Sequence, residues 1–210
     1  MSKEVKTREK VNMDPKYIIE LTVKLFVTCL VVAGLLGGVN AITADKIAAI
    51  NWEKTQKAMR EVVLDKENST FTEALELTDE MTEAAAVGGK LTELYGVQVG
   101  GETVGYAMKI VASGSQGNIE MMVGVDAEDA VTGVSVVKNS ETAGIGSRVM
   151  ENEPLKSTGI GVLDQFKGKS AADGELVATK NIEIIGGATV STRGVTAGVN
   201  AALAVAAVLG

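Results

Sequence analysis

Three hydroxyl residues follow a pair of glycines near the end of the sequence, in the stretch IIGGATVSTRG. They are Thr189, Ser191 and Thr192, and a run of small apolar residues comes after them. We predict that this run is a helix that begins at Ser191 or Thr192. The first turn of a helix carries unpaired N–H groups and the positive end of the helix dipole, which suit a phosphate. Small residues before it allow another molecule to approach the backbone: Gly186, Gly187 and Ala188.

Residue types alone leave two interpretations of this stretch open. In the first, it is an anion cradle in which Arg193 adds a positive charge and Thr189 offers a hydroxyl that can be acylated or phosphorylated. In the second, the serine and the threonines only cap the helix, which is the usual role of such residues at this position. The choice between them depends on the rest of the chain.

The composition excludes several kinds of chemistry. The chain has 210 residues and a formal net charge of −7, so clustered positive charge for binding nucleic acid is not expected. It has no histidine, and Cys29 is the only cysteine. Nucleophiles activated by histidine, structural zinc sites, haem ligation by histidine and iron–sulfur clusters are therefore excluded. A redox function would need an organic cofactor.

An uncharged segment, residues 25–44, is long enough to span a bilayer, since its twenty residues would reach roughly 30 Å as a helix. We predict a transmembrane helix over residues 21–44. Five basic residues precede it and the far flank has no comparable basic cluster, so the positive-inside rule places residues 1–20 in the cytoplasm and everything after residue 45 outside. The alternative is a secretory signal peptide, although the apolar run is longer than the 7–15 residues typical of one.

Beyond the span the sequence predicts a stalk and then an α+β domain. Residues 45–65 have mostly helical spacing, and residues 66–90 are mixed and acidic, so residues 45–90 are expected to be a stalk helix and linker. Short runs rich in Val and Ile predict an antiparallel meander: residues 93–99, 103–112, 118–126 and 131–138. The C-terminal apolar run is short for a second span, so we expect a buried helix on a twisted sheet in a domain of residues 91–210.

Two segments resemble motifs of the FMN-binding domain family of respiratory membrane complexes. Residues 183–189 are similar to its flavin-attachment sequence, Asp-x-x-Ser/Thr-Gly-Ala-Thr, and residues 140–146 are similar to its loop Ser-Glu-Thr-Pro-Gly-Leu-Gly. The segment QFKGK at residues 165–169 also matches the family pattern. Together with the single N-terminal span, the resemblance covers nearly the whole chain.

This resemblance implies a covalent cofactor. In the family, a flavin transferase joins FMN through its phosphate to the last threonine of the motif, as a phosphodiester; the matching residue is Thr189. The loop is implied to lie against the flavin ring. The resemblance extends the expected FMN contacts to Glu141, Thr142, Gly144, Ile145, Lys169, Gly187, Ala188, Ser191 and Thr192, with Lys167 as a further candidate. No metal site and no bond-making residue in turnover are implied.

Residue types keep simpler roles open for part of this set. Glu141 and Thr142 fit an ordinary turn closed by a side-chain hydrogen bond, and surface lysines such as Lys167 and Lys169 are usually solvated. The sequence also departs from the family pattern at three positions, where Gly186 replaces Ser or Thr, Glu183 replaces Asp and Ala143 replaces Pro. The acceptor hydroxyl itself is kept.

Within the family the chain is most like the G subunit of the Rnf complex, a ferredoxin:NAD oxidoreductase that moves Na⁺ or H⁺ across the membrane. The resemblance implies that FMN passes electrons between redox centres on the periplasmic or extracellular side, while partner membrane subunits move the ion. Three alternatives stay open: the C subunit of the Na⁺-pumping NADH:quinone oxidoreductase, which is longer, a membrane-anchored non-redox binding module, and a free-standing flavoenzyme. Flavin bound in the presence of a flavin transferase would argue against the binding module.

Overall fold

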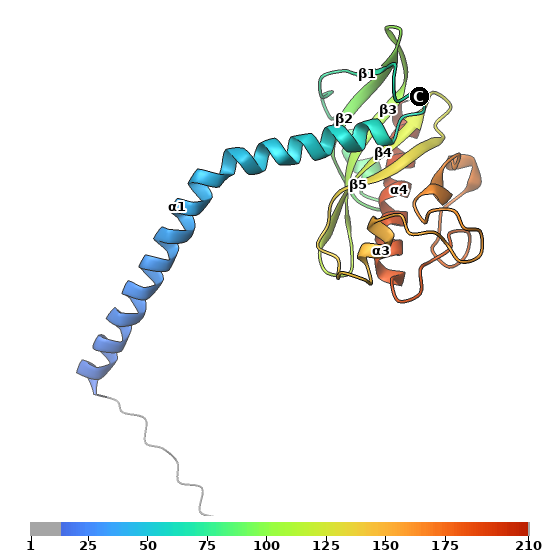
Figure 1. Cartoon of the computed structure of the whole chain (residues 1–210). Helices are drawn as coiled ribbons and strands as arrows, with labels where there is room; N and C mark the ends of the chain where they lie inside the picture. Colours follow the sequence, from blue (N-terminus) through green and yellow to red (C-terminus); the bar gives the residue numbers. More distant parts are fainter. Residues whose placement is uncertain (1–13, 210) are drawn as a thin grey trace, which may run out of the picture. The chain divides into compact units, whose positions relative to one another are not determined.

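The structure is a computed structural model that describes residues 14–209 (Figure 1). It contains two compact units, residues 1–50 and residues 51–210, which we treat separately. One helix, α1 (Pro15–Glu61), crosses the boundary between them. It begins where the Asp14 carboxylate accepts the backbone N–H of Lys16 at 3.0 Å and where Pro15 supplies a preset φ for the first turn.

The first unit contains the apolar part of α1, which is long and apolar enough to cross a membrane. Its threonines are compatible with hydrocarbon surroundings because their hydroxyls bond back to carbonyls of the preceding turn. Thr22 donates to Ile18 at 2.8 Å, and Thr28 donates to Lys24 at 2.9 Å. Such bonds satisfy a hydroxyl where water is excluded. The predicted span at residues 21–44 is therefore a continuous helix with its side-chain hydroxyls paired.

The second unit is built on a five-stranded antiparallel sheet in the order β1-β2-β3-β4-β5. Its strands are β1 (Ser69–Phe71), β2 (Lys90–Val99), β3 (Glu102–Ser113), β4 (Asn118–Asp126) and β5 (Val131–Lys138). The four predicted strands are confirmed as a meander. Between β4 and β5, the Asp126 carboxylate accepts the N–H groups of Glu128 and Ala130 at 3.1 and 2.8 Å, which closes the turn.

The segment expected to be a linker, residues 66–90, contains two regular elements. These are β1 and a short helix, α2 (Asp79–Ala85), which begins where the Thr78 hydroxyl accepts the N–H of Met81. Strand β1 pairs in register with β2, with Ser69 opposite Val99. A three-residue strand is too short to show alternation, and its pairing partner lies almost thirty residues away, so local periodicity did not reveal it.

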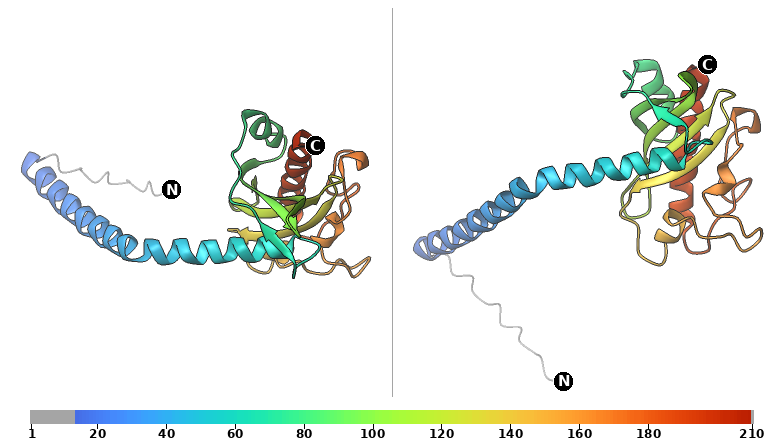
Figure 2. Two further views of the ribbon diagram at one scale, coloured as in Figure 1. Left: turned by 90° about the horizontal axis from the view of Figure 1, so that it is seen from above. Right: turned by 45° about the horizontal axis from the view of Figure 1, so that its top comes forward.

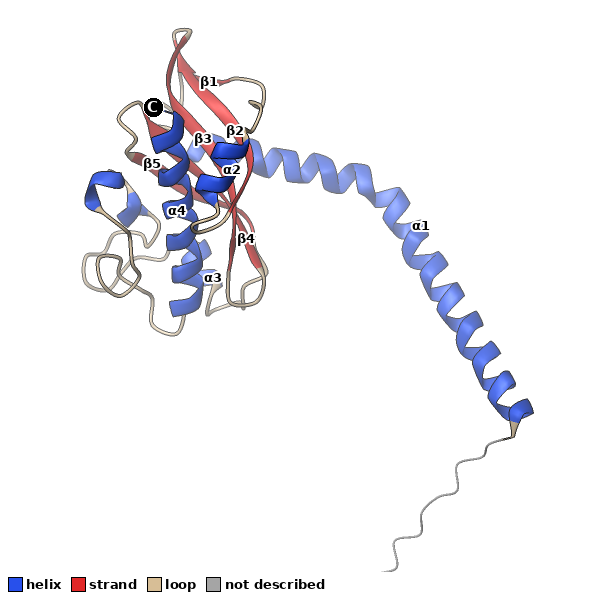
Figure 3. Cartoon of the chain, turned by 180° about the vertical axis from the view of Figure 1, so that it is seen from behind, coloured by secondary structure: helices blue, strands red, loops and turns tan. Residues whose placement is uncertain are grey.

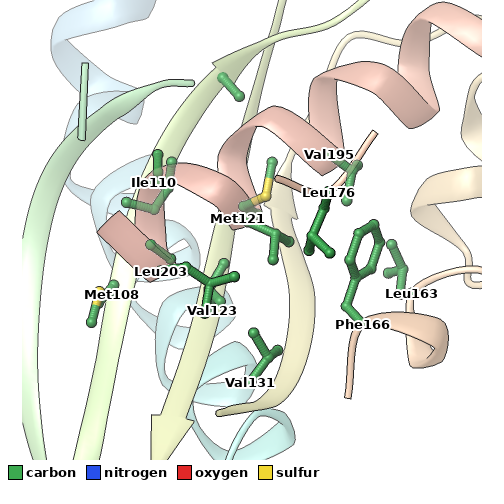
Figure 4. Close-up of a cluster of buried hydrophobic side chains, with 14 of the residues drawn as sticks. Met108, Ile110, Met121, Val123, Val131, Leu163, Phe166, Leu176, Val195 and Leu203 are labelled. Atoms are coloured by element: carbon green, nitrogen blue, oxygen red, sulfur yellow. The ribbon is translucent and has the colours of Figure 1, made fainter. Parts of the chain in front are cut away.

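The C-terminal helix α4 (Thr189–Leu209) packs with α2 against one face of the sheet (Figure 3). This confirms the expected buried helix; although it is long and apolar enough to be a span, most of it is buried in the domain. Figure 4 shows how Val195 and Leu203 of the helix meet Met121 and Val123 of β4, with Phe166 of a later loop closing the cluster. The burial of this apolar stripe fixes α4, and with it the hydroxyl-rich first turn.

Two glycines allow α4 to approach the strands closely. A Cβ atom built on Gly194 would lie 2.4 Å from the carbonyl oxygen of Ser113, at the end of β3. One built on Gly198 would lie 2.8 Å from the thioether of Met121. The first contact is with backbone, which cannot rotate away, so Gly194 sets the distance between the first turns of α4 and the sheet.

The other face of the sheet is covered by the C-terminal end of α1 (Figure 2). Ala58, Met59 and Val62 are buried there against Val97 and Met122. The end of the predicted stalk is therefore part of the core. The chain after β5 forms loops with the short helices α3 (Ser147–Met150), η1 (Asp164–Phe166) and η2 (Ala171–Asp173).

Candidate functional site

The first turn of α4 begins at Thr189, so the prediction of a start at Ser191 or Thr192 is wrong. The residue before the helix is Ala188, which is buried and has no side-chain oxygen. An alanine at this position cannot accept the free N–H groups of the first turn as a serine or aspartate would. These donors and the positive end of the helix dipole remain directed out of the helix beside Thr189, as an anion site requires.

The three hydroxyls of the first turn have different surroundings. The Ser191 side chain is buried and donates to the Glu141 carboxylate, and the Thr192 side chain is buried and donates to the Ala188 carbonyl at 3.0 Å. Thr189 is half-buried, and its hydroxyl forms no hydrogen bond within the described residues. Ser191 and Thr192, which were expected to contact FMN, thus have side chains that face the interior of the domain. Of the three hydroxyls, that of Thr189 is the one open to a reaction.

The two glycines before the helix, Gly186 and Gly187, differ in backbone conformation. Gly187 has φ +85°, a left-handed conformation that disfavours other residues, while Gly186 has an ordinary φ. A Cβ atom at either position would meet nothing within 4 Å, so the turn is open on its outer side. Gly187 is therefore needed for the backbone path, and Gly186 is free to carry a side chain.

We expect Gly187→Ala to destabilise the domain by about 1 kcal/mol, because alanine must adopt the left-handed conformation. The matched variant Gly186→Ser should stay within about 0.5 kcal/mol of the parent, since its side chain points into open space. Chemical denaturation of both variants measures this. Equal losses at the two glycines would contradict the assigned backbone conformations.

The loop after β5 lies against the first turn of α4 through Glu141. One oxygen of the Glu141 carboxylate accepts the backbone N–H groups of Ser115 and Gln116, at 2.7 and 3.2 Å, and the other accepts the Ser191 hydroxyl. The Asn139 side chain accepts the N–H of Glu141 at 3.1 Å, which is the turn bond that residue types suggested. The Glu141 carboxylate is therefore engaged with the protein itself.

The other predicted loop residues are exposed beside this contact. The carbonyl of Thr142 accepts the N–H groups of Ile145 and Ser147, while the side chains of Thr142 and Ile145 face outward. Gly144 has φ +73° and donates its N–H to the Ser147 hydroxyl at 2.9 Å. Ile145 is 50% exposed, which is high for an isoleucine in a closed turn. These residues form an accessible, partly apolar loop next to the open turn.

The structure does not bring the two predicted lysines to the site. The backbone of Lys169 pairs with Val131 at the start of β5, whereas the loop with Glu141 follows the end of this eight-residue strand. At about 3.3 Å per residue, the two ends of β5 are about 25 Å apart. The Lys169 ammonium lies 3.7 Å from the Asp173 carboxylate, and that of Lys167 lies 2.6 Å from Asp164. Each lysine forms an ion pair with an aspartate three or four residues away in its own loop.

Sequence reasoning missed Arg148, which links helix α3 to the glycine turn. Its guanidinium binds both oxygens of Glu153 at 2.6 and 2.7 Å and also donates to the carbonyl of Gly186 at 3.3 Å. These hydrogen bonds hold the pKa of Glu153 below the ordinary value for a glutamate. The paired arginine thereby fixes the turn that precedes Thr189. No motif or regular spacing marks Arg148 in the sequence. Its contact with Gly186, 38 residues away, forms only when the chain folds.

We expect Glu153→Gln to remove stability in a pH-dependent way. Because the folded-state pKa is lowered, the contribution of the pair is complete at neutral pH and is lost as the pH falls below about 4.3 and through the lower folded value. Melting temperatures of the parent and the variant should therefore differ at pH 7 and converge in acid. Glu151→Gln, a change at an exposed neighbour, is the control. A difference that stays constant down to pH 3 would contradict this assignment.

The segment QFKGK acts on the site through its first two residues. The Gln165 amide donates to the carbonyl of Glu183 at 3.0 Å and accepts the N–H of Glu183 at 2.8 Å. Phe166 is fully buried in the core and anchors the segment. The Glu183 side chain accepts a hydrogen bond from the Ser157 hydroxyl. Gln165 therefore fixes the backbone at the first residue of the attachment motif.

Two cavities flank the glycine turn and the first turn of α4. A cavity of about 210 Å³ has a mixed apolar and charged lining that includes Arg148, Leu155, Lys156, Glu183, Ile184 and Gly186. A groove of about 640 Å³ runs beside α4, with Lys90, Gly114, Asn118, Val190, Arg193 and Gly194 among its lining residues. Each has cationic side chains and an apolar or glycine wall, which suits an anionic group attached to an aromatic ring. Within residues 14–209, no group of acidic or cysteine side chains could hold a metal ion.

Comparison with known proteins agrees with this geometry. The model of the FMN-binding domain family matches residues 114–204, from the β3–β4 turn to α4. The G subunit of the Na⁺-translocating ferredoxin:NAD⁺ oxidoreductase complex of Acetobacterium woodii is 34% identical over 145 residues, which are 67% of this chain and 69% of that protein. The chain belongs to the family of Rnf G subunits. The G subunit of the ion-translocating oxidoreductase complex of Methanosarcina acetivorans is 28% identical over 134 residues, covering 62% of this chain and 67% of that protein.

Membership of the family of Rnf G subunits explains what the site contains. An FMN-binding domain supplies electron-transfer chemistry through its flavin, so the absence of histidine and of cysteine outside α1 is no obstacle to a redox role. The matched region also includes four segments that meet at the first turn of α4: the β3–β4 turn, the loop after β5, α3 and the glycine turn. The chain is thus a subunit of an ion-translocating oxidoreductase with a candidate N-terminal membrane helix.

Proposed function

We propose that the chain carries electrons in an Rnf-type complex through an FMN that is joined by a phosphodiester to Thr189. The observation that carries this proposal is the difference among the hydroxyls of α4. Ser191 and Thr192 are buried and hydrogen-bonded, whereas the Thr189 hydroxyl is accessible and unbonded within the described residues. Thr189 is also the last residue of the segment that resembles the family's attachment motif.

Attachment needs an activated phosphate. The Thr189 oxygen would attack the FMN phosphorus of a dinucleotide in which FMN and AMP share a pyrophosphate. A new phosphorus–oxygen bond forms, the pyrophosphate bond breaks, AMP leaves, and the hydroxyl proton passes to a base of the flavin transferase. The N–H groups at the start of α4 would stabilise the anionic phosphate. The chain has no histidine and places no base on the Thr189 hydroxyl within the described residues, which is why the proton is assigned to the transferase.

The loop beside Thr189 would hold the flavin ring. Thr142, Gly144 and Ile145 are exposed next to the open turn, and the backbone at Gly186 and Gly187 offers close approach, with Ala188 buried behind it. FMN supplies the redox chemistry, and these residues would orient its ring and limit access of water. We place Lys167 and Lys169 outside this set, because they lie at the other end of β5. The protein's part in turnover is to position the cofactor.

The membrane arrangement is also part of the proposal. The basic N-terminal flank favours a cytoplasmic N-terminus, with the FMN domain on the outer side of the membrane. A covalent bond would keep FMN from diffusing away there. Partner membrane subunits of the complex would exchange electrons with the flavin and move Na⁺ or H⁺, since α1 is the only exposed apolar helix among the described residues and forms no ion path by itself.

The proposal is tested by expressing the full chain with an active flavin transferase and viewing flavin fluorescence in a denaturing gel. A fluorescent band is expected, and it should survive denaturation because the bond is covalent. A dark band, with the transferase active on another substrate, would overturn the proposal. The departures at Gly186 and Glu183 would then be the first positions to restore, through Gly186→Ser and Glu183→Asp.

A further inference from the structure

The Glu141 carboxylate occupies a space that two glycines create. A Cβ atom on Gly114 would lie 2.3 Å from one carboxylate oxygen, and a Cβ on Gly146 would lie 2.3 Å from the other. Gly114 precedes the β3–β4 turn, and Gly146 ends the loop after β5. Neither glycine has a positive φ, so the backbone does not require glycine there. Both positions must lack a side chain because the Glu141 carboxylate fills the space where a Cβ atom would lie.

This carboxylate joins three segments of the site: the β3–β4 turn, the loop after β5 and the first turn of α4. It accepts two N–H groups from Ser115 and Gln116 in the β3–β4 turn, and it accepts the Ser191 hydroxyl from the first turn of α4. Ser191 is only 2% exposed and Glu141 is half-buried, so the hydroxyl end of this bond is shielded from water. Hydrogen bonds to a charged acceptor are stronger than neutral ones. The β3–β4 turn is closed by the hydrogen bond from the Gly114 N–H to the Gly117 carbonyl at 2.7 Å, and through Glu141 it fixes the rotation of the helix turn that presents Thr189.

We propose that Glu141 is a positioning residue for flavin attachment, which acts on Thr189 through Ser191 and does not contact the flavin. This inference rests on the proposed attachment at Thr189. It differs from the role that the family resemblance implies, in which the loop glutamate contacts FMN. With both carboxylate oxygens bonded to the protein, Glu141 orients the acceptor before the flavin donor arrives. Pre-organised positioning of this kind speeds a reaction without touching the reacting atoms.

The test is a double-mutant cycle on the rate of attachment. The full chain, the Glu141→Ala and Ser191→Ala variants and the double variant are each incubated with flavin transferase and the FMN–AMP dinucleotide, and covalent fluorescence is followed in time. Each single variant should slow attachment about tenfold. The double variant should be no slower than Glu141→Ala alone, because both changes break the same link. Losses that multiply to about a hundredfold would overturn the proposal.

Two further variants separate positioning from folding and from direct contact. Asp126→Asn is the matched control, since this carboxylate also accepts two turn N–H groups but lies at the other end of the sheet; it should attach FMN at the parental rate. Glu141→Gln keeps an acceptor for the turn, so its attached FMN should show the parental absorption spectrum. A changed spectrum would indicate direct contact and contradict the proposal. Melting temperatures show which variants are folded.

Ser191→Ala keeps the proposal falsifiable if Glu141→Ala does not fold, because it removes one hydroxyl and leaves the carboxylate bonded to the β3–β4 turn. If Ser191→Ala attaches FMN at the parental rate, this result alone contradicts the proposal that Glu141 acts on Thr189 through Ser191. A parent chain that never becomes fluorescent would instead contradict the proposed attachment at Thr189. The two failures are therefore distinguishable in one experiment.

Discussion

Replacing Thr189 with alanine is expected to abolish covalent flavin while leaving the fold intact. The hydroxyl is the proposed acceptor and forms no hydrogen bond within the described residues, so its loss removes the reaction and little stability. Alanine also favours a helix, and the change at the first position of α4 should shift stability by no more than about 0.5 kcal/mol. Denaturing-gel fluorescence measures the flavin, and thermal unfolding measures the fold.

Thr189→Ser is the matched control for this loss. Serine keeps the hydroxyl on the same backbone position, so attachment should continue, at a lower rate if the β-methyl of threonine helps to orient the oxygen. A fluorescent Thr189→Ala band would contradict the assignment of the acceptor. Loss of fluorescence in Thr189→Ser together with a lowered melting temperature would show a structural role for the side chain.

Gly194→Ala should have the largest effect on stability, with a loss of about 3 kcal/mol. A Cβ atom at this position would lie 2.4 Å from the Ser113 carbonyl, and α4 must move away from β3 to relieve the clash. Movement of the helix also displaces its first turn, so flavin attachment should fall in the fraction that remains folded. Urea unfolding measures the loss.

The control for Gly194 is Gly186→Ala, which adds the same methyl group in open space and should leave the urea midpoint within error of the parent. Alanine raises helix propensity inside α4, so propensity alone would stabilise Gly194→Ala by up to about 1 kcal/mol. A stabilised Gly194→Ala variant would therefore contradict the close approach of helix and strand. The sign of the effect decides between propensity and packing.

Much of the sheet could be predicted from sequence because its strands carry their own signals. Short runs rich in Val and Ile between glycine-containing or acidic turns predicted β2 to β5, and the structure agrees within three residues at each boundary. Strand β1 has three residues and forms only by pairing with β2, so no local pattern could reveal it. Composition predicted the buried helix α4, because sixteen uncharged residues are short for a membrane span.

The site was predicted in part. The loop after β5 meets the first turn of α4 through the hydrogen bond between Glu141 and Ser191. The start of α4 was placed too late because serine and threonine usually cap helices. Here the helix begins earlier, so Ser191 and Thr192 face the interior. Arg148 and the glycine pair around Glu141 act through contacts between segments. Such contacts join residues that are far apart in the chain, so no local sequence pattern predicts them.

The most direct test of the account is the mass of one tryptic peptide. Trypsin cuts after Lys180 and Arg193, which releases residues 181–193 with the glycine turn and all three hydroxyls of the first turn of α4. In protein matured with a flavin transferase, we predict a mass increase equal to FMN minus water, which fragmentation assigns to Thr189. An unmodified peptide, or FMN on Ser191 or Thr192, would contradict the account.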